Sequence, residues 1–169
     1  MMADVVRVVV LLAVGIVTIG WLGSLFRADT VVEPAAVNYA AIATTAQDAA
    51  GFELAVPADL PDGWRATSAR WHPDEQRWHL GLLTAEDQYV GLEQLPAGVS
   101  ETRTAYAPDA TEAGSVTVGG RPWMRLVDED TGAVSLLREW RSSTVLVNGS
   151  APAPALEGFA RRVTASPPS

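Results

Sequence analysis

Residues 8–26 form a run of 19 positions without a charged side chain, bounded by Arg7 and Arg27. An α-helix of that length is about 28 Å long, close to the thickness of the hydrocarbon core of a bilayer. No second apolar run of this length follows in the sequence. We therefore expect a single-pass transmembrane helix, in contact with the lipid bilayer through residues 5–26, that anchors one domain to the cell membrane.

A cleaved secretory signal is the alternative for this segment. Such a signal usually has a shorter apolar region of about 7 to 15 residues, followed directly by a small-x-small cleavage site. The residues after the run, 27–31, contain no such site, although Ala36 and Ala40 leave a later one open. We favour retention as a signal-anchor. Lipidation through cysteine is excluded, because the chain contains no cysteine.

The charges that flank the helix predict its orientation. The amino terminus and Arg7 precede the helix and Arg27 follows it, so the N-terminal side has one positive group more. Positively charged flanks tend to stay in the cytoplasm. We expect the C-terminal domain to be extracytoplasmic and to belong to the cell envelope.

The part of the chain after the anchor is acidic. From residue 28 onward, 10 arginines stand against 19 carboxylates, a balance of −9, and there is no lysine. Phosphate backbones would repel such a domain unless its arginines gathered in one patch, so we expect no nucleic-acid partner. The close basic pairs are Arg138 with Arg141 and Arg161 with Arg162, and the second pair suits a helix C-terminus.

We divide the chain into four segments. They are a transmembrane anchor at residues 1–27, an alanine-rich juxtamembrane helix or stalk at 28–50, an α+β domain at 51–165 and a disordered tail at 166–169. Alanine favours the helix in the second segment, and Gly51 suits its end. The sequence leaves open whether that helix packs on the domain or stands apart from it.

Short apolar runs separated by turn residues predict an antiparallel sheet. Pro61, Asp62 and Gly63 are typical of a turn, and so is the pair Gly119 and Gly120. An irregular stretch is expected between a three-stranded meander and four further strands. The predicted strands cover residues 64–71, 77–84, 88–95, 115–118, 123–127, 133–140 and 144–147, and the irregular stretch covers 97–114.

The chain closes with the pattern of an amphipathic helix. Leu156, Phe159, Ala160 and Val163 follow the spacing i, i+3, i+4, i+7, and Pro154 suits the first turn. Such an apolar stripe needs a partner, and one face of a sheet would provide it. The predicted fold class is therefore α+β, with an antiparallel sheet of about seven strands covered by the alanine-rich helix and the C-terminal helix.

Two motifs carry a resemblance to a known family. The first is LPDGWR at residues 60–65, and the second runs from WHLG at 78–81 to YVGLEQ at 89–94. In these motifs the chain resembles the DUF4245 family, small membrane-anchored actinobacterial proteins that form a domain of unknown function. The resemblance implies no catalytic residues. A departure lies at residues 149–156, where alternating Ala and Pro replace the expected serine-aromatic-acidic start of the last helix. More remotely, the chain is similar to PsbP-like extracytoplasmic domains, which implies an accessory or binding role.

Five tryptophans outside the anchor fit either a core or a binding cleft. They are Trp64, Trp71, Trp78, Trp123 and Trp140. If residues 73–76 form a turn, Trp71 faces Trp78 across a hairpin, and core packing is the favoured interpretation.

Metal and nucleophile sites have little support in the sequence. The same hairpin register places His72 and His79 on the opposite face beside Arg70 and Arg77, so a metal would lack a third ligand and would meet two cations. The acidic residues 128–130 lack the spacing of a calcium loop. No Gly-x-Ser-x-Gly elbow is present, and neither histidine has an identifiable partner for a Ser/His/Asp site. We expect no metal, no cofactor and no catalytic residue.

The candidate residues for binding a ligand or a partner are His79, Glu93, Gln94 and Arg70. With residues 86–87 as the turn, His79 opposes Gln94 and Leu80 opposes Glu93, so polar groups interrupt a strand that should be central. A polar network that merely satisfies its own hydrogen bonds is the alternative.

We expect a non-catalytic interaction or accessory domain of the envelope, with an envelope protein as its partner. The alternative is an extracytoplasmic small-molecule or lipid-binding domain whose tryptophans line a pocket. An unrecognised hydrolase comes third.

Overall fold

The structure, a computed structural model, describes residues 36–164. The predicted anchor at residues 8–26 and the predicted tail at 166–169 lie outside the described residues. Among residues 36–164, no helix combines the length and the apolar character needed to cross a membrane.

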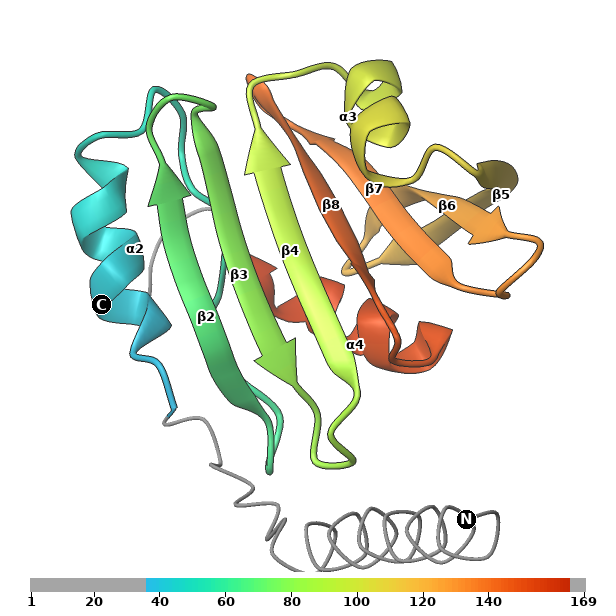
Figure 1. The fold of residues 1–169 in the computed structure, drawn as a ribbon, viewed down its shortest axis with the longest axis horizontal. Coiled ribbons are helices and arrows are strands. Elements are labelled where there is room, and N and C mark those ends of the chain that lie inside the picture. The colour runs from blue at the N-terminus through green and yellow to red at the C-terminus, as the bar shows by residue number, and fades with distance from the viewer. Residues whose placement is uncertain (1–35, 165–169) are drawn as a thin grey trace, which may run out of the picture. The chain divides into compact units, whose positions relative to one another are not determined.

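Seven antiparallel strands form the main sheet, as the sequence predicts, in the order β2-β3-β4-β8-β7-β6-β5 (Figure 1). Two meanders, β2 to β4 and β5 to β8, are joined through the pairing of β4 with β8. The strands are β2 (Arg65–His72), β3 (Arg77–Leu83), β4 (Tyr89–Leu95), β5 (Ala110–Val118), β6 (Arg121–Asp128), β7 (Val134–Trp140) and β8 (Ser143–Gly149). A separate two-stranded sheet pairs β1 (Val56–Pro57) with β9 (Val163–Thr164).

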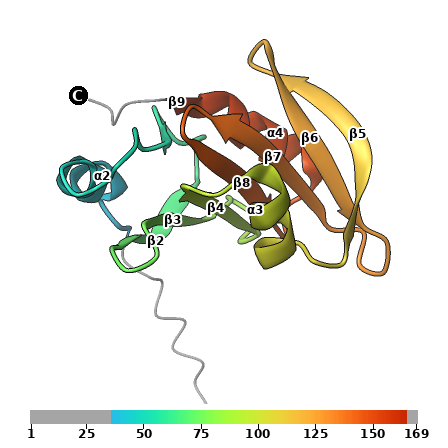
Figure 2. The ribbon, with the colours of Figure 1, turned by 90° about the horizontal axis from the view of Figure 1, so that it is seen from above.

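Within residues 36–164, three helices pack around the main sheet. They are α2 (Tyr39–Gln47), α3 (Val99–Tyr106) and α4 (Ala153–Arg162). Figure 2 shows α3 and α4 on opposite faces of the sheet, with α2 beside the edge strand β2. The alanine-rich helix packs on the domain, because Ala43 and Ala46 of α2 are buried in the main core. The side chain of Asn38 caps this helix by accepting a hydrogen bond from Ala41 N at 3.1 Å.

Helix α4 covers one face of the sheet through three members of the predicted apolar stripe, whereas the fourth, Val163, follows the helix and begins β9. Leu156, Phe159 and Ala160 are buried, and the Phe159 ring stacks on Trp64 with 6.2 Å between the ring centroids. The alternating Ala and Pro residues do begin this helix, with Pro152 at the N-cap and a second proline in the first turn. The main core lies between α4 and the sheet.

The five tryptophans within residues 36–164 belong mainly to this core. Trp78 and Trp123 are fully buried and Trp140 is 4% exposed, whereas Trp64 and Trp71 are half-buried and pack against the core. The predicted pairing of Trp71 with Trp78 across the β2–β3 hairpin is confirmed.

The stretch predicted to be irregular contains α3 and the start of β5. Helix α3 fully buries only Thr102, partly buries Val99 and Tyr106 and has no side-chain N-cap, so its apolar pattern is too short to predict a helix. Strand β5 is exposed along most of its length at the sheet edge, and its register shifts between Glu112 and Ser115. These features hide the alternation on which strand prediction depends.

The two halves of the sheet differ on the side that faces away from α4. Helix α3 contacts β7 and β8 and covers a small second cluster: Ala107, Ala110, Leu126, Leu137 and Leu146. In the described part of the chain, no element lies over β2, β3 and β4 on that side (Figure 1). We call this surface the open face, and Ser68, Arg77, His79, Tyr89 and Glu93 mark it.

Candidate functional site

The register of β3 with β4 decides which side chains reach the open face. His79 pairs with Glu93, and Leu80 pairs with Leu92. The predicted pairing of His79 with Gln94 is therefore wrong by one residue. A shift of one residue exchanges the two faces of a strand, so Glu93 joins His79 on the open face and Gln94 turns into the core.

The error comes from the loop between these strands. It contains the five residues 84–88, not the two-residue turn that the sequence suggested, because Leu83 pairs with Tyr89. The hydroxyl of Thr84 holds the loop by accepting hydrogen bonds from the backbone nitrogens of Glu86 and Gln88, each at 3.2 Å. Asp87 adopts a positive φ of 59°, which allows the chain to reverse without glycine.

Four side chains of the open face form one polar network. Nδ1 of His79 lies 2.5 Å from Oε1 of Glu93, and Nε2 of His79 lies 3.0 Å from the Ser68 hydroxyl. Arg77 donates to the second oxygen of Glu93 at 3.0 Å, and its Nε donates to exposed Glu75 at 2.7 Å. The network of Ser68, Arg77, His79 and Glu93 is thus partly shielded from water yet accessible from the open face.

Arg77 remains cationic within this network. Partial burial lowers the pKa of Arg77, but the hydrogen bonds to Glu75 and Glu93 outweigh it and raise that pKa overall. Its positive charge compensates Glu93, which is only 8% exposed. A buried carboxylate without such a partner would be costly.

Arg70 and Gln94, the other two candidates, have different positions. Arg70 pairs with His79 across the β2–β3 ladder, as predicted, and its exposed side chain lies at the margin of the network. Gln94 is completely buried on the core side, where its amide bonds Ala55 N at 2.6 Å and Ser143 Oγ at 2.9 Å. Gln94 therefore holds the core together and does not reach the open face.

A pair of glycines brings the Tyr89 ring down onto the sheet. Gly81 and Gly91 face each other across β3 and β4. A Cβ atom at Gly91 would lie 2.9 Å from the Tyr89 hydroxyl, and one at Gly81 would lie 2.4 Å from the Ser68 hydroxyl. The missing side chains thus make room for both the Tyr89 ring and the contact between Ser68 and His79.

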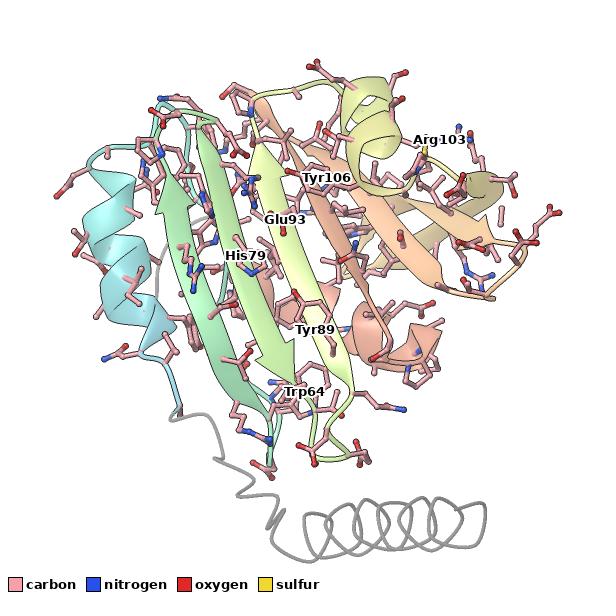
Figure 3. The ribbon with its side chains drawn as sticks, in the orientation of Figure 1. Trp64, His79, Tyr89, Glu93, Arg103 and Tyr106 are labelled. Carbon is pink, nitrogen blue, oxygen red and sulfur yellow. The ribbon has the colours of Figure 1, made fainter. Side chains whose placement is uncertain are left out.

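A cavity of about 370 Å³ lies beside the network, and we call it the tyrosine cavity. Figure 3 shows Tyr89 from β4 and Tyr106 from the end of α3 near Glu93 and His79. The lining consists of Tyr89, Tyr106, Ala107, Pro108, Asp109, Ala110, Asp128, Ala133, Val134, Ser135, Asn148, Gly149 and Ser150. Arg103 supports the rim from outside the lining by donating to the carbonyl oxygen of Ala110 at 2.9 Å.

The charges in the lining of the tyrosine cavity are negative. Its ionisable side chains are Asp109, Asp128 and the two tyrosines. Backbone hydrogen bonds from Thr131 and Asp130 lower the pKa of Asp128, which is therefore ionised at neutral pH. Partial burial raises the pKa of Tyr89 and Tyr106, so both phenols stay neutral. Carboxylates beside aromatic rings suit a cationic group.

Three side chains of the network are also hydrogen-bonded in the sequence that a catalytic nucleophile, its base and an orienting acid would have. Ser68, His79 and Glu93 are linked through the two nitrogens of one imidazole, as in a Ser-His-acid triad. The expectation that neither histidine has a partner is therefore wrong for His79. His72 pairs with Arg77 at the end of the hairpin and lies outside this chain of hydrogen bonds. Residues 36–164 contain no group of three His, Cys, Asp or Glu side chains that could hold a metal ion.

The fold and the site define an α+β domain with one covered and one partly open sheet face. The family model described as "Protein of unknown function (DUF4245)" matches residues 3–163, and the chain belongs to this family. Its second motif builds the open face, because it contributes His79 and Gly81 of β3 and Tyr89, Gly91 and Glu93 of β4. None of the curated proteins matches the chain.

Several residues of the site were not predicted from the sequence. Ser68 could have been found from the β2–β3 register, although the register shift between Ala66 and Ser68 obscures its alternation. Tyr106 and Asp109 lie at or just after the end of α3, whose apolar signal is weak, and Asp128 was considered only as part of an acidic run that lacks calcium-loop spacing. No local pattern brings these three together, because the pairing of β4 with β8 creates the cavity.

Proposed function

We propose that this chain is a membrane-anchored, non-catalytic interaction domain of the cell envelope that binds its partner on the open face. The main support is the contrast between the two sides of one sheet. The side under α4 is closed by an apolar core, whereas the same central strands carry a charged network and a cavity on the other side. Strands that are covered on both faces are normally apolar on both.

The chemistry of the tyrosine cavity supports a cationic group as the ligand. Tyr89 and Tyr106 provide two aromatic rings, and Asp109 and Asp128 provide negative charge. A guanidinium or ammonium group gains from both, since ring faces and carboxylates attract cations. We propose that the partner is a protein that inserts an arginine or a lysine side chain into this cavity.

The sequence supports the location of this interaction. The uncharged run at residues 8–26 has the length of a membrane anchor, and the positive groups before it favour a cytoplasmic N-terminus. The domain would then face the envelope, held near the membrane, where a second anchored or secreted protein could reach the open face.

The test is titration of the full chain in neutral detergent micelles with acetylated tri-arginine amide, followed by NMR. The expected result is saturable shifts in the signals of Tyr89, Tyr106 and Asn148. Replacing both cavity carboxylates, Asp109→Asn with Asp128→Asn, should weaken binding about tenfold or more, because each charge-assisted contact contributes about 1.5–3 kcal/mol.

The matched control is the pair Asp62→Asn and Asp74→Asn. It removes the same charge from exposed turns and should change affinity less than about twofold, since exposed charges are well screened. If both pairs of substitutions weakened peptide binding equally, the peptide would be responding only to the net charge of the domain. That result, or the absence of any shift, would contradict the proposal.

A hydrolase is the second candidate, favoured by the hydrogen-bonded order of Ser68, His79 and Glu93. Two features rank it below a binding domain. The backbone N–H groups of the interior strands β3 and β4 are used in ladders and cannot form an oxyanion hole. Glu93 also shares its charge with Arg77, which weakens its support of a charged imidazole.

A fluorophosphonate probe separates the two candidates, because it labels an activated serine covalently. The binding proposal expects Ser68 to stay unlabelled in the full chain. Labelling that disappears in Ser68→Ala and in His79→Gln, but persists in Ser100→Ala on α3, would establish a nucleophile and overturn the non-catalytic assignment.

A further inference from the structure

Three arginines gather on the α4 side of the sheet, away from the open face. Arg121 begins β6, Arg138 lies near the end of β7, and Arg161 is in the last turn of α4. They line a cavity of about 240 Å³ together with Trp123 and Trp140, and we call it the arginine cleft. Its remaining walls include Val118 and Ala160 and are mostly apolar.

Two guanidinium groups, those of Arg121 and Arg138, lie over the indole rings of the cleft. Cζ of Arg138 lies 4.8 Å from the ring centroid of Trp140 and 5.8 Å from that of Trp123. Cζ of Arg121 lies 5.9 Å from the Trp140 centroid. Such cation–π contacts help to hold both cations in place, and they leave the guanidinium N–H groups able to donate.

These arginines have no carboxylate partner within residues 36–164. The arginines that do form ion pairs there are Arg65, Arg77, Arg141 and Arg162. Other arginines there also lack an ion pair, so the distinguishing feature of these three is that they lie together around one cleft. Burial and the nearby charge of Arg121 lower the pKa of Arg138, which indicates positive charge that is not neutralised.

Trp140, in the wall of the cleft, has a buried donor. Trp140 is 4% exposed, and its Nε1–H is buried without an acceptor in the described part of the chain. A buried N–H group without an acceptor costs free energy. An anion in the cleft would neutralise the arginines and would lie close enough to the Trp140 ring for its N–H signal to report on binding.

We infer that the arginine cleft binds a phosphate group. Two or three converging guanidiniums match the charge of a phosphate and offer paired donors to its oxygens. The group could come from inorganic phosphate or from the headgroup of an anionic phospholipid. The inference is independent of the proposed function, since the cleft lies on the other side of the sheet.

The experiment follows the indole N–H signal of Trp140 by NMR in the full chain, assigned through its loss in Trp140→Phe. One arm titrates inorganic phosphate in neutral detergent against sodium chloride of equal ionic strength. The other compares nanodiscs of phosphatidylglycerol with nanodiscs of phosphatidylcholine. A saturable shift in the first arm assigns free phosphate, and a shift confined to phosphatidylglycerol assigns a headgroup.

Substitutions test whether the cleft itself is responsible. Exposed Arg121→Gln should weaken binding about tenfold or more, and Arg138→Lys should weaken it as well, because lysine retains the charge but loses the planar fork. The control Arg65→Gln removes one charge at a distant surface pair and should have less than about a twofold effect.

Three results would overturn the inference. One is a Trp140 signal that stays unmoved in both arms. Another is equal weakening by Arg121→Gln and Arg65→Gln, which would indicate unspecific attraction. The third is binding of acetate as tight as that of phosphate, which would assign the cleft to carboxylates.

Discussion

Gln94 shows how one polar side chain can hold a core together. It is fully buried and links the segment before β1 to strands β4 and β8 through its amide. Its side chain accepts from Ala55 N and donates to Glu53 O and Ser143 Oγ. Because these contacts are structural, polarity alone does not identify a binding residue on a central strand.

Replacing Gln94 with leucine should therefore destabilise the domain. The Ala55 N–H would lose its acceptor in a buried place, and the expected cost is about 2 to 4 kcal/mol in the free energy of unfolding. Gln88→Leu, in the loop after β3, is the control and should change it by less than about 0.5 kcal/mol. Chemical denaturation measures both. Equal midpoints for wild type and Gln94→Leu would show that the amide network is dispensable.

Asp128 predicts a pH dependence with a definite sign. Folding lowers the pKa of this carboxyl below its ordinary 3.8 through backbone hydrogen bonds. Its stabilising effect is therefore complete above that value and is lost as pH falls through the lower folded-state value. The stability advantage of wild type over Asp128→Asn should be constant from about pH 7 to 5 and shrink below 3.8. An advantage that grows on acidification would refute the assignment.

At the scale of elements, α4 is the helix on which the main core depends. Its Phe159 ring is fully buried and stacks on Trp64. Phe159→Ala should cost about 3 to 5 kcal/mol. Gly158→Ala, one position earlier, meets no atom within 4 Å and should instead stabilise the domain by about 0.5 to 1 kcal/mol. Thermal and urea denaturation give both values, and an unchanged midpoint for Phe159→Ala would exclude this face of α4 from the core.

How far the sequence predicts each element depends on its local signals. Helix α4 has an apolar stripe and the β2–β3 hairpin a clear turn sequence, so both were predicted with the right residues facing each other. The predicted β3–β4 register was wrong because the loop between these strands has five residues, held by the Thr84 hydroxyl, and not the two that were expected.

Within the site, His79 and Glu93 could be selected as unusual polar residues on strands. Their contact with Ser68 could not be predicted without the correct pairing of the strands. Tyr106 and its cavity depend on a non-local strand pairing that no local pattern encodes.

At the scale of the whole molecule, two surfaces of opposite charge preference lie on the two sides of one sheet. The tyrosine cavity has Asp109 and Asp128, and the arginine cleft has Arg121, Arg138 and Arg161. If both proposals hold, the domain joins a basic protein partner to a phosphate group near the membrane. The open face would bind the protein partner, and the arginine cleft would bind the phosphate group.

The proposed topology makes a prediction for cells. Positive groups before residues 8–26 favour an extracytoplasmic domain by a margin of one charge. Protease added to intact, wall-stripped cells should digest the domain while a cytoplasmic marker survives. Arg7→Gln removes the excess of one positive charge on the N-terminal side and should increase the fraction of the domain that is protected from protease. Complete protection of the wild-type domain until lysis would place it in the cytoplasm instead.

Photo-crosslinking from the tyrosine cavity tests binding on the open face most directly. A benzophenone amino acid would replace Tyr106, which lines the cavity, or exposed Ala58 before the β2 meander. We predict a discrete adduct from position 106 in cells, absent from position 58 and lost when Asp109→Asn and Asp128→Asn are added. The crosslinked segment should contain arginine or lysine. Adducts of the same mass from both positions, or none from position 106, would contradict binding at the open face.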